Sequence, residues 1–591
     1  MPTTKKIYRK ILIWRYRYIS ERQFIYILSV LVGFLAGIGT FILKDLTFLI
    51  EEGLQGNLIK EYHYAFYFIF PIIGLFLVFG IKKFIVKRNI GHGISTTLHA
   101  ISRRNGIIKR YQIFASLITA PITVGFGGSA GLQGPAVSSG AALGSNVAQL
   151  FHMNSKTRML LIGCATAGAM SSMFQAPIAA IIFAVEIFSL DLAFASLVPL
   201  LLASVSAVIT TYFFVGTDVL FRFKLVDVFE VKDIPFYAAL AFLTGIASVY
   251  FSKMYFKIIN FFEQFNSPFK RLLIGGIAIG IMLYLIPPLY GEGYGLINNL
   301  LKGNTAVALK DIPYNLDLEN VYVVVLMLLL IAIFKAIAMT TTFAAGGVGG
   351  IFIPTLFMGS ALGNAIAKVI NHLGFFVSES NFTLIGMTGL MAGVLHAPLT
   401  AIFLIAEITG GYELFVPLML VSAISFAFTK YFVSNSIYTV ELAKKGQLIT
   451  HNKDKNVIML MRIDNLIERN FKSITREMTL GEMLKNSVAK SKRNIFPVLD
   501  EKKHFLGIVL LDDIRPMMFD QSQYHKTYVS DFMKLAPAII FHDDAVEDVM
   551  KKFKESGAWN LPVVENEKYV GFISKSKLLT AYRNKLIEVT A

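Results

Sequence analysis

The sequence predicts an all-α protein that crosses a membrane many times, followed by a smaller α/β part. Hydrophobic residues make up 55% of the chain and charged residues only 16%, whereas globular proteins carry roughly 25% charged residues. The apolar residues are concentrated between residues 24 and 433. After residue 450 the composition is that of an ordinary soluble protein.

Seven apolar runs carry most of the hydrophobicity, and most are long enough, or nearly so, to span a bilayer core as helices. Helices in the core of a large soluble protein would show polar faces. These runs lack them, which argues against a large soluble helical protein. The runs are Phe24–Ile50, Ala65–Gly80, Met159–Val185, Ala193–Val215, Val321–Phe334, Leu384–Ala406 and Leu414–Phe428. The single cysteine, Cys164, rules out internal disulfides, and its apolar surroundings predict a packing role.

The N-terminal segment, residues 1–22, is strongly basic and precedes the first apolar run. By the positive-inside tendency it lies in the cytosol. It is not a cleavable signal, because the apolar run after it is too long and no small-residue cleavage site follows. We therefore interpret the net charge of +17 as a signal for orientation, and predict no nucleic-acid partner. The basic residues are Lys5, Lys6, Arg9, Lys10, Arg15, Arg17 and Arg22.

The apolar part contains an internal repeat. Residues 135–148 recur 219 residues later as 354–367, with six identical positions. A second pair, 174–187 and 395–408, follows in the same order and in nearly the same register. Two such matches indicate duplicated halves, which in transporters are often inverted in the membrane with the ion site between them.

Glycine and proline interrupt both halves at matching points. Gly127–Pro135 and Gly346–Pro354 each come just before a helical segment. Broken backbone at membrane depth is tolerated only where protein or a water-filled cavity surrounds it, and the helix amino ends that follow would favour an anion. The glycines could instead serve close helix packing, but two such stretches at equivalent points favour a site.

A polar linker, residues 441–456, leads to two similar α/β modules at 457–522 and 523–591. In the first we expect a helix over 479–491 and strands over 495–499 and 505–510. In the second we expect a helix over 545–555 and strands over 560–564 and 569–573. The segment Phe496-Pro497-Val498-Leu499 matches Leu561-Pro562-Val563-Val564. This pair resembles a tandem of CBS modules, which often sense adenine nucleotides.

Four motifs, in order, resemble those of the CLC family of anion channels and transporters. Gly91-His92-Gly93-Ile94-Ser95 stands where the family has G-S-G-I-P, and Gly131-Leu132-Gln133-Gly134-Pro135 where it has G-R-E-G-P. Gly349-Gly350-Ile351-Phe352-Ile353-Pro354 closely matches G-G-I-F-x-P, and Tyr438 falls where the family has an anion-binding tyrosine. The resemblance covers about residues 25–445, and we assign the membrane domain to 23–440.

The resemblance implies a homodimer in the cell's inner (plasma) membrane, with one pore per subunit, both termini in the cytosol, and chloride or a similar small inorganic anion as the bound ion. A dehydrated anion in a pore needs hydrogen-bond donors but leaves too slowly from a full cation. The anion-binding residues carried over by position are His92, Gly93, Ile94, Gln133, Gly134, Ile351, Phe352 and Tyr438. For Tyr438 an interfacial tyrosine is the alternative.

Two departures from the family bear on coupling. Gln133 replaces the gating carboxylate, and Ile187 stands where the family's exchangers usually have the internal proton-relaying carboxylate. Proton coupling needs titratable groups along a path, so we expect a passive anion channel or uniporter regulated by the CBS modules. Glu186 and its repeat mate Glu407 are interpreted as structural caps or ties between helices.

His92 leaves alternatives open. A neutral imidazole could donate a hydrogen bond to the anion. A protonated imidazole would hold the anion more strongly and make occupancy of the site depend on pH. A histidine that only fills space agrees equally well with the sequence. The alternative functions are therefore a proton-coupled exchanger with its path through His92, or a channel for bicarbonate, nitrate or fluoride. A sensor that signals through the CBS modules is a further class. No metalloprotease or hydrolase motif occurs in the membrane part, so we expect no enzyme, no metal site and no cofactor.

The nucleotide pattern of CBS modules is incomplete in both copies. The first copy has Asp513 but Leu510 where the pattern needs Ser or Thr, and the second has Ser574 but Lys577 where it needs Asp. Asp513 and Ser574 are thus the candidate adenine-nucleotide ligands. A purely structural dimerisation module is the alternative.

Overall fold

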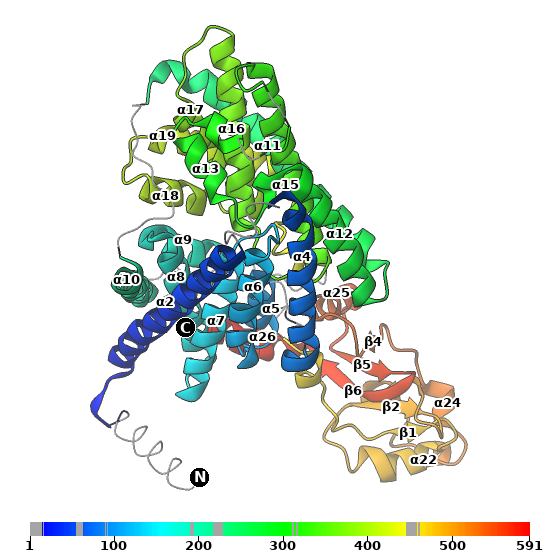
Figure 1. Ribbon diagram of the computed structural model, residues 1–591. Coiled ribbons are helices and arrows are strands. Elements are labelled where there is room, and N and C mark those ends of the chain that lie inside the picture. Colours follow the sequence, from blue (N-terminus) through cyan, green and yellow to red (C-terminus); the bar gives the residue numbers. More distant parts are fainter. Residues whose placement is uncertain are drawn as a thin grey trace. The chain divides into compact units, whose positions relative to one another are not determined.

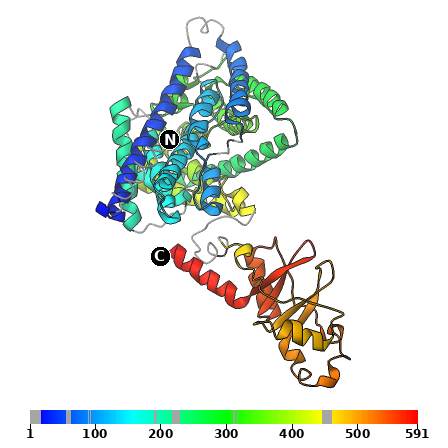
Figure 2. The ribbon, with the colours of Figure 1, turned by 90° about the horizontal axis from the view of Figure 1, so that it is seen from below.

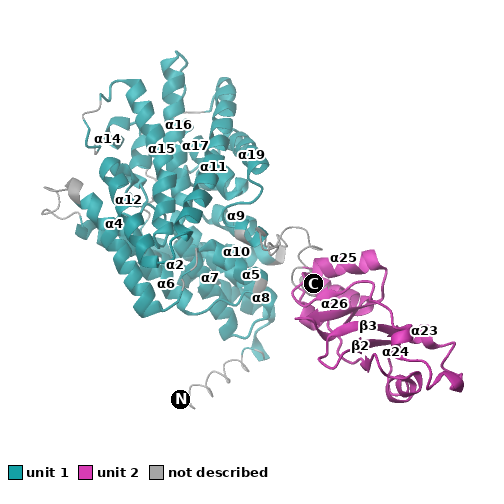
Figure 3. Cartoon of the chain, turned by 90° about the vertical axis from the view of Figure 1, so that its right-hand side faces the viewer, with its two compact units in different colours: residues 1–445 teal, residues 446–591 magenta. Residues whose placement is uncertain are grey.

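The computed structural model describes residues 15, 17–54, 63–88, 90, 93–188, 194–216, 229–309, 312–314, 317–444, 458 and 461–590. The chain forms two compact units, residues 1–445 and 446–591 (Figure 3). We describe each unit by itself.

The first unit is helical throughout the part that the structure describes. Its first half contains α2 (Glu21–Leu54), α4 (His63–Gly80) with the π turn Ile81–Val86, α5 (Ile94–Arg103), α6 (Tyr111–Gly125), α7 (Gln133–Leu150), α8 (Ser155–Phe174), α9 (Pro177–Phe188) and α10 (Phe194–Val215). Its second half contains α11 (Ile234–Glu263), α12 (Pro268–Leu285), α13 (Tyr294–Leu301), α14 (Thr305–Leu309), α15 (Val321–Ala344), α16 (Phe352–His372), α17 (Glu379–Leu395), α18 (Pro398–Ile408), α19 (Phe415–Phe432) and α20 (Val440–Lys444).

Eight helices among the described residues are long and apolar enough to cross a membrane. They include the spans 231–263 and 268–285, which the apolar runs did not single out. Residues 234–252 and 272–285 of these spans carry no charged side chain, so hydropathy alone would have identified both. Cys164 packs as expected, buried with its sulfur 3.7 Å from the Ser29 hydroxyl.

Two of the predicted runs are each divided into two helices. The run 159–185 breaks between α8 and α9 at Gln175, and the run 384–406 breaks between α17 and α18 at His396. These equivalent residues have φ of 54° and 56°, the left-handed conformation that ends a helix. A proline then opens each following helix, where its missing N–H costs nothing.

The two halves repeat the same packing. In the first half α7 packs on α8, α2 on α10, and α6 on α7. In the second half α16 packs on α17, α11 on α19, and α15 on α16 (Figures 1 and 2). Pro135 and Pro354 are each the third residue of their helix, α7 and α16. The duplication predicted from the sequence is therefore confirmed.

One antiparallel contact joins the equivalent loops of the two halves. The N–H of Gly131 donates to the Gly350 carbonyl at 2.9 Å, and the N–H of Gly350 donates to the Gly131 carbonyl at 2.7 Å. Equivalent residues exchange both bonds in this way when an approximate two-fold rotation relates their chains. The two loops thus run antiparallel at this contact, as expected for an inverted repeat.

The second unit contains two sheets with the same strand order. In each sheet a short first strand is parallel to the central strand, and the third strand is antiparallel to it. The strands are β1 (Ile474–Thr475), β2 (Ile495–Leu499), β3 (Phe505–Leu510), β4 (Ile540–Phe541), β5 (Asn560–Glu565) and β6 (Lys568–Ser574). The helices are α22 (Leu480–Met483) with a π turn to Val488, α23 (Leu511–Ile514), α24 (Val529–Phe532), α25 (Val546–Ser556) and α26 (Lys575–Thr590).

Four of these strands were expected from the sequence, and the two-residue strands β1 and β4 were not. The helix predicted over 479–491 is shorter, because it changes to a π turn at Leu484. The two modules share a core: Glu468 pairs with Phe572, and the rings of Phe505 and Tyr569 stack at 6.1 Å.

Candidate functional site

The amino ends of α7 and α16 meet at the paired glycine loops. A Cβ on Gly350 would lie 2.6 Å from the amide nitrogen of Gly134, and one on Gly134 would lie 2.9 Å from the Gly350 Cα. Only glycine allows this approach. The first amides of each helix have no acceptor within the helix, and both helix dipoles place positive potential here. This geometry suits an anion.

The first predicted motif joins the same place. Gly93 has φ of 49°, and a Cβ on it would lie 3.0 Å from the Gly134 carbonyl oxygen. Ile94 follows as the first residue of α5 and is only 2% exposed. A third helix therefore begins beside α7. His92 lies outside the described residues.

Gln133 is the first residue of α7 and is 1% exposed. Its Nε2 donates to the Tyr294 hydroxyl at 3.1 Å and to Glu292 Oε1 at 3.3 Å. Its buried Oε1 has no hydrogen-bond partner among the described residues. The amide is thus held by two polar groups that the sequence motifs did not include.

The third predicted motif forms an apolar wall. Ile351 is the N-cap of α16 and Phe352 its first residue, and both are buried. The Phe352 ring lies 5.2 Å from the ring of Phe174 and 6.1 Å from that of Phe183. An anion at the α16 amides would therefore meet backbone donors beside aromatic side chains.

Tyr438 lies in the turn between α19 and α20 and is 7% exposed. Its buried hydroxyl has no hydrogen-bond partner in the part of the chain that the structure describes, so no hydrogen bond from it reaches the other predicted residues. A buried hydroxyl without a partner costs free energy. It remains a donor for a ligand.

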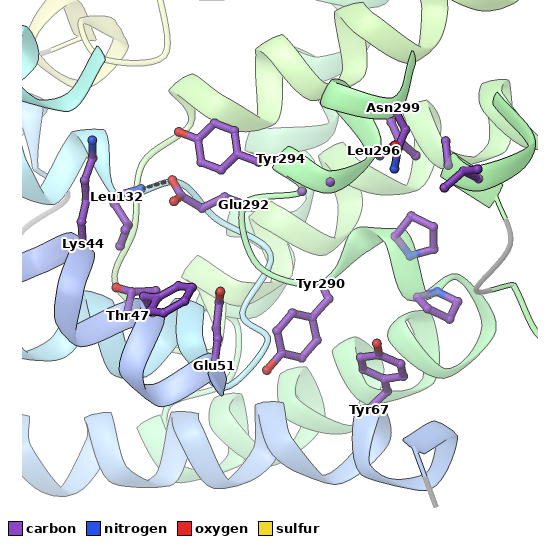
Figure 4. A pocket seen from close by; sticks show the side chains of 17 residues that line it. Lys44, Thr47, Glu51, Tyr67, Leu132, Tyr290, Glu292, Tyr294, Leu296 and Asn299 are labelled. Atoms are coloured by element: carbon purple, nitrogen blue, oxygen red, sulfur yellow. Dashed lines mark hydrogen bonds between the residues drawn. The ribbon is translucent and has the colours of Figure 1, made fainter. Parts of the chain in front are cut away.

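The structure adds a carboxylate that the sequence reasoning missed. Glu292 lies in the loop between the turn Pro287–Leu289 and α13. Its carboxylate accepts a hydrogen bond of 2.9 Å from the N–H of Leu132, the residue directly before α7. Glu292 also lines a polar cavity of about 610 Å³. Figure 4 shows its side chain pointing at the start of α7, with Tyr294 nearby. In the sequence Glu292 stands between two glycines, Gly291 and Gly293, a pattern that does not by itself indicate this contact.

Lys335 was missed as well, although it is the only charged residue in α15. It is fully buried. Its Nζ donates to the carbonyls of Gly291 at 2.9 Å and Leu289 at 3.3 Å and lies 4.5 Å from the centre of the Phe357 ring. Lys335 therefore holds the loop that carries Glu292. An ionisable residue inside an apolar helix is by default a candidate for function, and the predicted run stopped at Phe334.

Glu186 and Glu407 lie at equivalent positions and make reciprocal contacts. Glu186 accepts from the amides of Leu399 and Thr400 at the start of α18, at 3.2 and 2.9 Å. Glu407 accepts from the second and third amides of α9, at 3.0 and 2.7 Å. Both carboxylates therefore cap a helix of the other half, as the sequence predicted.

The candidate nucleotide ligands of the second unit are engaged within the protein. Asp513 forms an ion pair with Lys534 at 2.7 Å. The Ser574 hydroxyl accepts from the Lys577 N–H at 3.1 Å and lies 3.4 Å from Glu468 Oε1. Each module supplies only one part of the ribose pattern, and the assignment of these residues as nucleotide ligands stays a prediction.

The comparisons with known proteins agree with the fold. The family model for the voltage-gated chloride channel matches residues 73–430, more than half of the chain. The chain belongs to this family. The CBS domain model matches residues 463–519 and 529–584. The CLC protein is therefore a multi-pass membrane protein of an anion-transporting family, with a CBS pair in its second unit.

Two curated relatives are similar to the chain in sequence, and one solved structure is similar to it in fold. "Putative chloride channel protein ClcB-like" of Ralstonia nicotianae is 27% identical over 63% of this chain and 83% of its own length. The "H(+)/Cl(-) exchange transporter ClcA" of Salmonella paratyphi B is 25% identical over 71% and 88%. The structure of a slow cyanobacterial Cl⁻/H⁺ antiporter matches 72% of this chain and 98% of its own, with a TM-score of 0.61 and 19% identity.

Proposed function

We propose that this CLC protein is a passive channel or uniporter for chloride or a similar small anion. The supporting observation is the meeting of the α7 and α16 amino ends at Gly131 and Gly350, with an amide side chain at Gln133. Two helix amino ends that meet in this way attract an anion by their dipoles, without a fully charged side chain. Ile187, on α9, offers no proton relay.

The second candidate is a proton-coupled exchanger with a rewired proton path. It is favoured by Glu292, a carboxylate on the first amides of α7, and by the name of the Salmonella relative, an H⁺/Cl⁻ exchanger. His92 is the other titratable residue that the sequence offers for such a path. Bicarbonate, nitrate and fluoride stay alternative anions.

One liposome experiment separates the two functions. Purified protein is reconstituted with a chloride gradient, and chloride flux and internal pH are followed together. A passive pathway moves chloride without driving protons uphill, whereas an exchanger moves protons in a fixed ratio to chloride. Robust uphill proton movement by the unmodified protein would overturn our proposal. Repeating the flux with nitrate, bicarbonate and fluoride identifies the preferred anion.

The remaining features follow from the same proposal. The anion contacts are the Gly93–Ile94 and Gln133–Gly134 backbones, the Ile351 and Phe352 amides, the Tyr438 hydroxyl and His92. The protein acts as a homodimer in the plasma membrane, with both termini in the cytosol, membrane domain 23–440, linker 441–456 and CBS modules 457–522 and 523–591. Regulation by adenine nucleotide would act through these modules, and titrating the protein with ATP and AMP tests it.

A further inference from the structure

Glu292 occupies the place at the start of α7 where a helix favours an anion. One carboxylate oxygen accepts from the Leu132 N–H at 2.9 Å and from Gln133 Nε2 at 3.3 Å. We propose that Glu292 gates the anion pathway: its ionised carboxylate is a tethered anion that competes with the transported anion for the amino end of α7. This inference rests on the proposed anion pathway and adds a residue that controls it.

The loop around Glu292 fixes the backbone position from which its side chain extends. Gly291 and Gly293 have φ of 54° and 85°, backbone conformations that favour glycine. A Cβ on Gly293 would collide with the Phe357 ring. The short turn between two glycines therefore places Glu292 opposite the amide of Leu132.

The cavity offers space into which the side chain of Glu292 can turn. Glu292, Tyr290, Tyr294 and Leu132 all line the cavity of about 610 Å³ (Figure 4). When the carboxylate is protonated, its charge-assisted hydrogen bond to the Leu132 amide becomes a weaker neutral one. The side chain can then turn into the cavity and leave the α7 amides to a transported anion.

Two ammonium groups act on the charge of Glu292. Lys44 of α2 donates to the Met173 carbonyl at 2.7 Å and lines the same cavity. Lys335 of α15 donates to the Gly291 carbonyl at 2.9 Å, in the residue directly before Glu292. Both cations favour the ionised carboxylate, while its burial opposes ionisation.

The other titratable groups that line this cavity are a second carboxyl group and three tyrosines, Tyr67, Tyr290 and Tyr294. Glu51 of α2 lines the same cavity, and two carboxyl groups that share a cavity disfavour each other's ionised form. Tyr290 and Tyr294 stay neutral over the ordinary pH range. The two cations favour the ionised form of Glu292, whereas its burial and the nearby carboxyl group oppose it. A change of pH can therefore alter its protonation.

The test is chloride efflux from liposomes at equal pH on both sides, from pH 8 to pH 4.5. For the unmodified protein we expect flux to rise about tenfold as pH falls, because a charge-assisted bond is exchanged for a neutral one. Glu292→Gln keeps the side-chain volume and removes the charge, so its flux should be high and nearly independent of pH. Glu292→Asp keeps the charge on a shorter stem and should keep the pH dependence with weaker block.

Glu51→Gln is the matched control, since it removes another carboxyl group of the same cavity. Its flux should still depend on pH, with the profile moved to lower pH because Glu51 no longer disfavours the ionised form of Glu292. An unchanged pH profile in Glu292→Gln, or the loss of pH dependence in Glu51→Gln alone, overturns the gate. If Glu292→Gln fails to fold, an Asp variant that blocks as strongly as the unmodified protein overturns it as well. Absence of flux in all proteins at every pH contradicts the proposed anion pathway instead, so the two failures are distinguishable.

Discussion

Glu186 and Glu407 each cap a helix in the half of the protein that does not contain them. Glu186 binds the first free amides of α18, and Glu407 binds those of α9. Carboxylates at helix amino ends satisfy donors that the helix cannot satisfy itself and complement its dipole. The reciprocal pair ties the inverted repeats together near their helix breaks.

Removing either cap should destabilise the membrane unit. We expect Glu186→Ala and Glu407→Ala each to cost about 2 kcal/mol, because two amides at a helix amino end lose their carboxylate acceptor. Thermal unfolding in detergent measures the effect. Glu413→Ala, at an exposed position, should leave stability unchanged. Equal stability of all three variants would show that the caps are not needed.

The glycine contact between the halves should not tolerate a methyl group. Gly350→Ala would place its Cβ 2.6 Å from the Gly134 nitrogen, and overpacking of this kind costs ~1–3 kcal/mol. We expect lower yield of folded protein and loss of anion flux. Gly411→Ala is the control, since a Cβ there would meet nothing within 4 Å. A Gly350→Ala protein that conducts normally would contradict the close approach.

Tyr438→Phe should weaken anion binding without unfolding the protein. The change removes one buried hydroxyl that has no protein partner among the described residues and little volume. Losing one neutral hydrogen bond costs about 1 kcal/mol, or roughly fivefold in affinity. Calorimetric titration with chloride measures it. Tyr431→Phe, 84% exposed, serves as control, and equal affinity in both variants would remove Tyr438 from the site.

Gln133→Glu should introduce a further pH-dependent block. A carboxylate at the first position of α7 competes for the anion site when ionised and releases it when protonated. Because Glu292 Oε1 lies 3.3 Å from Gln133 Nε2, the two carboxylates would repel each other, and block should appear over a wider pH range. Flux measured against pH, with Gln133→Leu as the uncharged control, checks this. A Glu variant indistinguishable from the Leu variant would argue against an anion at this point.

Glu482 gives the second unit a pH-dependent contribution to stability. Its carboxylate accepts from the Thr479 N–H in a capping box at the start of α22. This backbone hydrogen bond, with the Thr479 side chain, lowers the pKa of Glu482. The stabilisation is therefore complete above the pKa that Glu482 has in the unfolded chain. It is lost as pH falls through the lower pKa that Glu482 has in the folded protein.

We expect Glu482→Gln to lower the unfolding temperature of residues 446–591 at pH 7, with the difference vanishing in acid below the ordinary range of a glutamate. Scanning calorimetry at several pH values measures this. Glu477→Gln, at an exposed position, should behave as the unmodified fragment at every pH. A difference that persists unchanged in acid would show that the cap does not depend on the charge.

The repeats, the helix caps and four CBS strands could be predicted because each depends on local sequence. Pro135 and Pro354 mark equivalent helices, and Glu186 and Glu407 occupy equivalent places in a visible duplication. Glu292 could not be predicted, because its role depends on a loop that lies 160 residues beyond Leu132 in the chain and meets it only in the fold. The spans 231–263 and 268–285 were missed although their residues 234–252 and 272–285 carry no charge, so the sequence did indicate them.

The Gly131–Gly350 pair also constrains biosynthesis. Each loop supplies the hydrogen-bond partners of the other, and a backbone group left unpaired at membrane depth is costly. When the ribosome has made only the residues up to α10, Gly131 has no partner yet. The helices of the first half can enter the bilayer at that stage, but the junction of α7 and α16 cannot exist until α16 has been inserted. The ion pathway is therefore completed only after α16 has entered the membrane.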